Sequence, residues 1–232
     1  MTPRGLPGAA EAGDAAAALA RHDSYWPAQL AVLTTILLDL DLPDKLTLHP
    51  IWLLPAFEGA LLLGLIVTTP RRGERPHRYR RWVAIALIGI VSAVNLLSLG
   101  LLTHYLLHTG ANVDGRQLIL AGVEIWVTNI LLFAVWYWEL DRGGPQGRKL
   151  TGADAPAPDF LFPQMTEERL GRWDWRAGFV DYLYVSFTNV SAFSPTDTMP
   201  LSASAKMLML IQATIAIVTI GLVVARAVNI LA

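Results

Sequence analysis

Residues 82–103 read WVAIALIGIVSAVNLLSLGLLT and contain no charged side chain. The hydrocarbon core of a bilayer is about 30 Å thick, and a helix needs roughly 20 apolar residues to cross it. An uncharged run of this length is therefore expected to form a transmembrane helix. Trp82 stands at its beginning, and tryptophan is common there because its ring is stable at the depth of the lipid headgroups.

Other segments have a similar composition. Residues 207–225 are uncharged, residues 51–69 and 118–138 each carry one glutamate, and residues 26–42 are apolar up to two aspartates near their end. Residues 178–194 are apolar but shorter and rich in Ser, Thr, Asn and Tyr. We therefore predict an all-α fold, a polytopic transmembrane helix bundle with five full spans plus one short crossing or re-entrant segment.

The overall composition agrees with a membrane protein. Of the 232 residues, 53% are hydrophobic and 16% are charged, whereas soluble domains carry roughly 25% charged residues. The net charge of −1 excludes a basic surface for nucleic acid, and the absence of cysteine excludes disulfides and thiolate chemistry. The sequence has no hydrolase, nucleotide-binding or metalloprotease motif, so we predict neither an enzymatic activity nor a cofactor.

Glycine and proline divide the chain into four regions. We expect residues 1–24 to form a disordered N-terminal tail, and residues 25–138 to form a four-helix membrane region. Residues 139–177 are a Gly/Pro-rich linker that cannot form a continuous helix. Residues 178–232 contain a short helix, a polar loop and the last transmembrane helix. Within the linker, residues 160–162 are aromatic and aliphatic and are expected to lie on the membrane surface.

The distribution of arginine predicts the orientation. The short loop 70–81 contains six arginines, whereas loops 43–50 and 104–117 contain one basic residue each. Basic loops remain on the cytoplasmic side, so we place loop 70–81 in the cytoplasm. With six crossings, both termini are cytoplasmic in a multi-pass protein of the cell membrane.

The stretch DYLYVSFTNVSAFSPTD, residues 181–197, carries a resemblance to a known family. It resembles the pore region of bacterial two-span potassium channels, where a helix that starts at an acidic residue leads into a T-V-G-Y-G filter. Pro200 and Lys206 continue the similarity. The C-terminal half also resembles a family of bacterial multi-pass membrane proteins without an assigned function, through its D-Y, F-T and T-D pairs.

The sequence departs from the channel family at the filter itself. Residues 192–196 read AFSPT, and they have no glycine where the family has two. A potassium filter points successive backbone carbonyls at the ion, and Pro195 fixes its own φ near −65°. We therefore expect no potassium-selective filter. A polar path here would be lined by side chains, namely Asn189, Ser191, Ser194, Thr196 and Asp197.

Two acidic residues have alternative interpretations. Glu58 lies near the middle of an expected span, where it is either a proton or cation ligand or a neutral buried carboxylic acid bonded within the bundle. Asp181 marks the start of the pore-like helix, where it either has a functional role or caps the helix. His104 and His108 are four residues apart, but no third ligand is near them in sequence, so we predict no metal site.

These observations favour a channel- or transporter-like membrane protein. Its partners would be the lipid bilayer, further copies of the same chain and a small ion. The alternative is a non-conducting membrane scaffold that binds lipid or a partner, in which the same polar side chains only join helices.

Overall fold

The computed structural model describes residues 25–41, 56, 59, 60, 62, 63, 66, 80–108, 115–150, 155–166, 175–191 and 197–231. Its longer helices are α2 (Trp26–Asp41), α4 (Arg80–His108), α5 (Gly115–Leu140), α7 (Phe179–Ser191) and α8 (Ala203–Leu231). The short elements are the 3₁₀ helices η2 (Asp141–Gly143) and η4 (Pro163–Met165), the helix α6 (Gly144–Gly147), and the strands β1 (Phe160–Leu161) and β2 (Met199–Pro200).

Three of the described helices, α4, α5 and α8, are long and apolar enough to cross a membrane. They agree with the three longest apolar runs of the sequence and establish a mostly helical, membrane-type architecture. The helix α2 is apolar over Trp26–Leu38, which is shorter than a full span. The expected span 51–69 and the basic loop 70–81 lie mostly outside the described residues, so five full spans remain a prediction.

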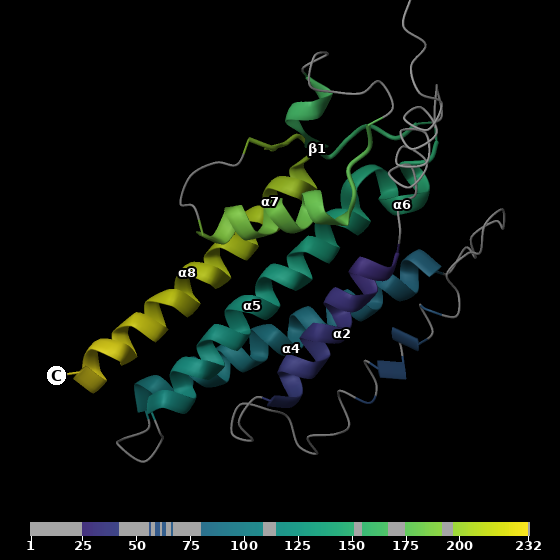
Figure 1. The fold of residues 1–232 in the computed structure, drawn as a ribbon. Coiled ribbons are helices and arrows are strands. Elements are labelled where there is room, and N and C mark those ends of the chain that lie inside the picture. Colours follow the sequence, from purple (N-terminus) through teal and green to yellow (C-terminus); the bar gives the residue numbers. More distant parts are fainter. Residues whose placement is uncertain are drawn as a thin grey trace, which may run out of the picture.

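The central helix is α5, which packs against α2, α4, α7 and α8 (Figure 1). The ring of Tyr25, just before α2, lies 5.6 Å from the ring of Trp138 near the end of α5. The start of α4 reaches the same end, because Arg81 lies beside Gly143. The first residues of α2, α4 and α8 and the last residues of α5 therefore gather at one end of the bundle (Figure 1).

A small antiparallel pair of strands connects the chain before α7 with the chain after it. Phe160 of β1 faces Pro200 of β2, and Leu161 faces Met199. The backbone N–H of Leu201 also donates to the carbonyl of Asp159 at 2.8 Å. Both chain segments that flank α7 are thus held at the end of the bundle where α8 begins.

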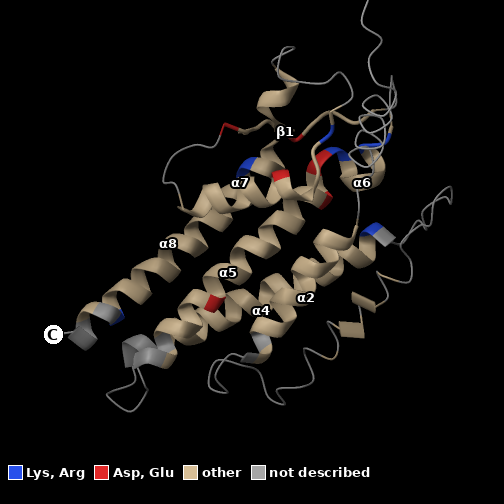
Figure 2. Cartoon of the chain, in the orientation of Figure 1, with Lys and Arg blue, Asp and Glu red and all other residues tan. Residues whose placement is uncertain are grey.

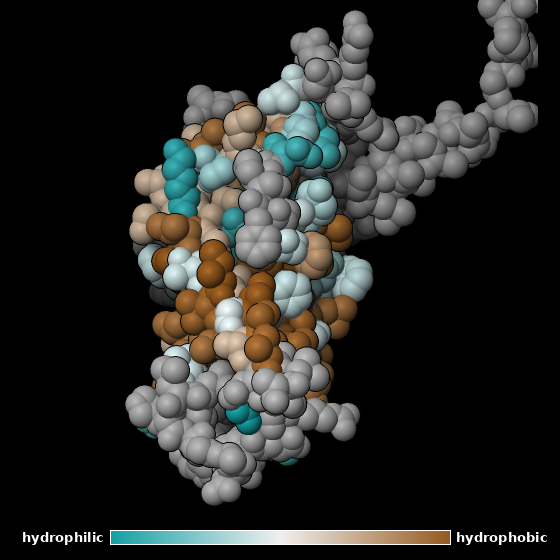
Figure 3. All heavy atoms as spheres, turned by 90° about the vertical axis from the view of Figure 1, so that its left-hand side faces the viewer, coloured by the Kyte–Doolittle hydropathy of each residue, from teal (hydrophilic) through white to brown (hydrophobic). Residues whose placement is uncertain are grey.

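Charge and hydropathy follow this arrangement. Acidic and basic residues gather around α6 and β1, whereas the long helices are almost free of them along their middles (Figure 2). On the face that Figure 3 shows, apolar side chains cover the middle and hydrophilic ones lie towards one end. The exposed helix faces are apolar, as in a protein that is solvated by lipid rather than water.

The linker differs from its expected position on the membrane surface. Phe160 and Phe162 are buried, and their rings pack against Tyr182 of α7 at centroid distances of 6.3 and 5.4 Å. Phe160 also contacts the ring of Tyr137. These two side chains extend the hydrophobic core beyond the end of α5, because the strand pair turns them towards α7.

Candidate functional site

The helix α7 is short and clearly amphipathic. Tyr182, Val185, Ser186 and Val190 point into the bundle, at the spacing of one helix face. The carboxylate of Asp181 accepts the backbone N–H of Gly178 at 2.7 Å, which satisfies a donor that the first turn leaves without a helical partner. The geometry around Asp181 is therefore that of a helix cap.

A buried polar network centred on Gln212 of α8 joins α7 to α5 and α8. Its side-chain oxygen accepts the hydroxyl of Tyr137 at 2.5 Å and the amide of Asn189 at 2.8 Å. Its side-chain nitrogen donates to the carbonyl and to the hydroxyl oxygen of Ser186, at 3.1 and 2.7 Å. The Ser186 hydroxyl in turn donates to the carbonyl of Ile130 at 2.6 Å. Every polar atom of the Gln212 side chain is therefore hydrogen-bonded.

This network lies deep along the helices. Ile130 precedes the last residue of α5, Leu140, by ten residues, which is about 15 Å at 1.5 Å per residue. The ring of Phe187 lies 6.3 Å from the ring of Trp126, one further turn along α5. The second half of α7 therefore lies about 15 Å along α5 from its last residue, a distance equal to half the thickness of a bilayer core.

Two buried amide oxygens, one on α5 and one on α4, have no protein partner. Asn129 is fully buried; its side-chain nitrogen donates to the carbonyl of Gln212 at 3.3 Å, but its oxygen accepts nothing. Asn95 of α4 is also buried, and its oxygen has no donor either. Both are buried polar acceptors inside the bundle, and the indole nitrogen of Trp126 in α5 is a buried donor that also has no acceptor.

A second set of contacts fixes the other end of α7, and Asp141 is at its centre. This residue is fully buried directly after α5. One carboxylate oxygen accepts the hydroxyl of Tyr182 at 2.7 Å, and the other accepts the backbone N–H groups of Asp159 and Phe160 at 2.7 and 3.3 Å. One side chain therefore connects the end of α5, the strand β1 and the first turn of α7.

The backbone turn after α5 allows Asp141 to reach these partners. Arg142, Gly143 and Gly144 all have positive φ, with values of 53°, 75° and 84°. Two successive glycines suit this turn because they adopt positive φ without a steric penalty. The turn returns the chain so that the Arg148 guanidinium donates to the carbonyls of Trp138 and Asp141, at 2.6 and 3.2 Å.

Arg148 also supports α7 through its aromatic neighbours. It is buried, and its guanidinium carbon lies 5.5 Å from the ring centre of Trp138 and 5.2 Å from that of Tyr182. Cation–π contacts of this kind are strongest when the cation is removed from water. The cation, the two rings and Asp141 thus form one buried cluster between the end of α5 and the first turn of α7.

The side chains that the sequence analysis assigned to a polar path are placed as follows. Asn189 is bonded to Gln212 and to the carbonyl of Met209 at 3.0 Å, and the Ser191 hydroxyl donates to the carbonyl of Phe187 at 2.6 Å. Asp197 is exposed, just before β2. Ser194, Thr196 and Glu58 lie outside the described residues. The structure therefore separates Asn189, inside the bundle, from Asp197 at its surface.

Sequence reasoning missed the residues at the two centres of these contacts. Gln212 is a lone amide inside an uncharged span, which is a recognisable signal for a helix–helix contact. Asp141 gives no such signal, because its partners come from positions 159, 160 and 182 and depend on the turn after α5. In the described part of the chain, no three acidic or histidine side chains gather as a metal site.

Comparisons with protein-family models, with curated proteins and with solved structures give no match for this chain.

Replacement of Gln212 by Leu should destabilise the protein by about 1–3 kcal/mol, because it removes the acceptor of the buried Tyr137 hydroxyl and the donor to Ser186. The measurement is unfolding of the purified protein in mixed micelles by a denaturing detergent. Gln117→Leu is the matched control, since Gln117 is exposed in the first turn of α5. Equal unfolding midpoints for the two variants would contradict a stabilising network.

Replacement of Asp141 by Ala should free the linker from α5. We expect amide hydrogen exchange at Asp159, Phe160 and Leu201 to accelerate by about tenfold or more, as each protecting hydrogen bond is lost or loosened. Asp141→Asn keeps one acceptor oxygen and should have a smaller effect. Unchanged exchange at these three amides in the alanine variant would show that Asp141 does not hold the strand pair.

Proposed function

We propose that this multi-pass membrane protein is channel-like and that α7 is a re-entrant helix held between α5 and α8. The observation that carries the proposal is the β1–β2 pair, which joins the chain before α7 to the chain after it at one end of the bundle. In support, α7 has 13 residues and is about 20 Å long, which is less than a bilayer core.

The order of elements supports the same proposal. The first element in this order is the long apolar helix α5, and the second is the short helix α7, which ends near the midplane in this proposal. The polar residues 192–197 and a second long apolar helix, α8, follow. The pore region of two-span potassium channels, which the sequence resembles, has the same order of elements. The polar groups of α7 are used for packing, so the lining of a path is assigned to Ser194, Thr196 and Asp197 from several copies around an axis.

Re-entry changes the expected positions of the chain ends. In this topology, the six-arginine loop and the linker lie on the same side of the membrane. The basic residues of the loop favour the cytoplasmic side. With five crossings rather than six, the N-terminus is cytoplasmic and the C-terminus is on the opposite side. The proposed topology thus differs from the prediction from sequence that both termini are cytoplasmic.

A non-conducting scaffold is the second candidate. It is favoured by the Gln212 network, in which the polar side chains of α7 bond to the protein itself. Polar side chains in membrane proteins often join helices in this way. The two candidate functions predict different ion fluxes but the same membrane topology.

Topology is tested by single cysteines in a chain that has none of its own. Thr166→Cys in the linker and Asp197→Cys after α7 should react with an impermeant thiol reagent from the same side, the cytoplasmic one. Val228→Cys near the end of α8 should be reached from the other side. Labelling of positions 166 and 197 from opposite sides would show that α7 crosses the membrane.

Ion flux is measured with purified protein in liposomes under separate potassium, sodium and proton gradients. We expect cation flux with little preference between potassium and sodium, because the filter glycines are absent. Asp197→Asn should reduce this flux by about tenfold, as it removes the exposed carboxylate next to the path. Met199→Ala, a change at the neighbouring exposed strand position, is the control. No flux in the native protein would favour the scaffold, whereas equal flux in all three proteins would contradict the assignment of Asp197 to the path.

A further inference from the structure

Two amides in the middle of the bundle bury an oxygen that has no hydrogen-bond donor. Asn95 of α4 is 4% exposed and Asn129 of α5 is fully buried. In the part of the chain that the structure describes, neither side-chain oxygen accepts a hydrogen bond. The large majority of buried polar side-chain atoms in proteins are bonded to the protein or to ordered water, because an unpaired one loses its hydration without compensation. The two oxygens therefore indicate a bound donor.

The two amides lie on the helix faces that pack against each other. Leu99 of α4 and Ile125 of α5 belong to one buried apolar cluster. Asn95 precedes Leu99 by four residues, Asn129 follows Ile125 by four, and residues four apart share a helix face. Because α4 and α5 run in opposite directions (Figure 1), both steps lead the same way along the interface. The amides thus occupy the next turn beyond the apolar cluster.

A direct contact closes the interface on the other side of this turn. The indole nitrogen of Trp136 in α5 donates to the hydroxyl of Ser92 in α4 at 2.9 Å. Ser92 lies three residues before Asn95, and Trp136 lies seven residues after Asn129. The section of the α4–α5 interface that contains both amides is therefore bounded by a contact at each end.

The helix α8 completes the junction and orients one of the amides. Ile215 of α8 packs against the same apolar cluster. Three residues earlier, the backbone carbonyl of Gln212 accepts the side-chain nitrogen of Asn129 at 3.3 Å. Since a carbonyl can only accept, this contact sets the nitrogen of Asn129 towards α8 and leaves its oxygen as the remaining acceptor.

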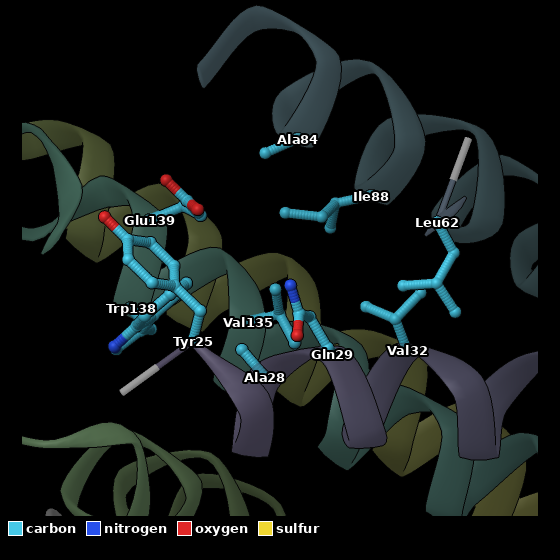
Figure 4. Close-up of a pocket in the computed structure, with 10 residues that line it drawn as sticks. All are labelled: Tyr25, Ala28, Gln29, Val32, Leu62, Ala84, Ile88, Val135, Trp138 and Glu139. Atoms are coloured by element: carbon cyan, nitrogen blue, oxygen red, sulfur yellow. The ribbon is translucent and has the colours of Figure 1, made fainter. Parts of the chain in front are cut away.

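The side of α5 that faces α2 is different. A void of about 20 Å³ lies there between α2, α4 and α5, and its lining is mainly apolar (Figure 4). It has room for about one water molecule. No buried nitrogen or oxygen of the side chains drawn in Figure 4 lacks a partner. The polar groups that require a ligand are thus at the junction of α4, α5 and α8 and not at this void.

We propose that the junction of α4, α5 and α8 contains a bound water molecule that donates hydrogen bonds to the side-chain oxygens of Asn95 and Asn129. Water fits this pair of acceptors because it supplies two donors and carries no charge. A charge at the middle of a bilayer is costly without an opposite charge, and no group of acidic or histidine side chains among the described residues could hold a metal ion. The water connects α4 to α5, and the proposal is independent of the role assigned to α7.

The direct test is an experimental structure of the native chain in nanodiscs at a resolution that shows ordered water. We expect one density peak at about 2.5–3.0 Å from both amide oxygens. The proposal is wrong if the amides bond to each other or to other protein donors, or if the space between their oxygens is empty. A peak with oxygen ligands on all sides would indicate a cation and would also contradict the proposal.

Unfolding in mixed micelles by a denaturing detergent tests the same water energetically. Asn95→Leu and Asn129→Leu each remove one acceptor, and the double variant removes both. Because the two amides share one ligand, the unfolding midpoint of the double variant should decrease by less than the sum of the two single decreases. Additive decreases would overturn the shared ligand. Thr214→Val is the control partner for Asn95→Leu and should be additive with it, since the exposed Thr214 hydroxyl bonds within its own helix.

Salt distinguishes water from a cation at the same position. The unfolding midpoint of the native chain should be equal in sodium chloride and choline chloride at the same concentration, because no ion binds at the junction. A higher midpoint in sodium chloride that is lost in Asn95→Leu would replace the water by a cation site.

Discussion

A helix that ends inside a bilayer must be held by its neighbours, since lipid offers no hydrogen bonds to its backbone or polar side chains. The helix α7 is about 20 Å long, and in the proposed re-entrant topology it depends on this condition. Asp141 holds its first turn through Tyr182, and Gln212 holds its second half through Ser186 and Asn189. Asp141 directly follows α5, and Gln212 belongs to α8, which packs on α5. The central helix α5 therefore determines the position of α7.

The long helices could be predicted from sequence and α7 only in part, for a physical reason. Hydropathy over 82–103 is a local property, and it identifies a span wherever the segment lies. Whether α7 crosses or returns depends on the pairing of Phe160 with Pro200, forty residues apart in the chain. The burial of Phe160 depends on the same pairing, so composition alone placed it on the surface.

The polar residues around α7 show why residue type alone does not identify a conducting path. Asn189 was a reasonable lining residue from its position, but its amide is hydrogen-bonded to Met209 and Gln212. Gln212 has no feature in a hydropathy profile that separates it from a lipid-facing amide. Its role follows from four hydrogen bonds to three residues on two other helices, which only the packed structure brings together.

The strand pair has a consequence for biogenesis. Since β2 and Gln212 both follow α7 in the chain, neither is available when α7 leaves the ribosome. The contacts at the second half of α7 are therefore completed late in assembly, and a truncated chain that ends before position 200 would keep the Asp141–Tyr182 contact but lack β2 and Gln212.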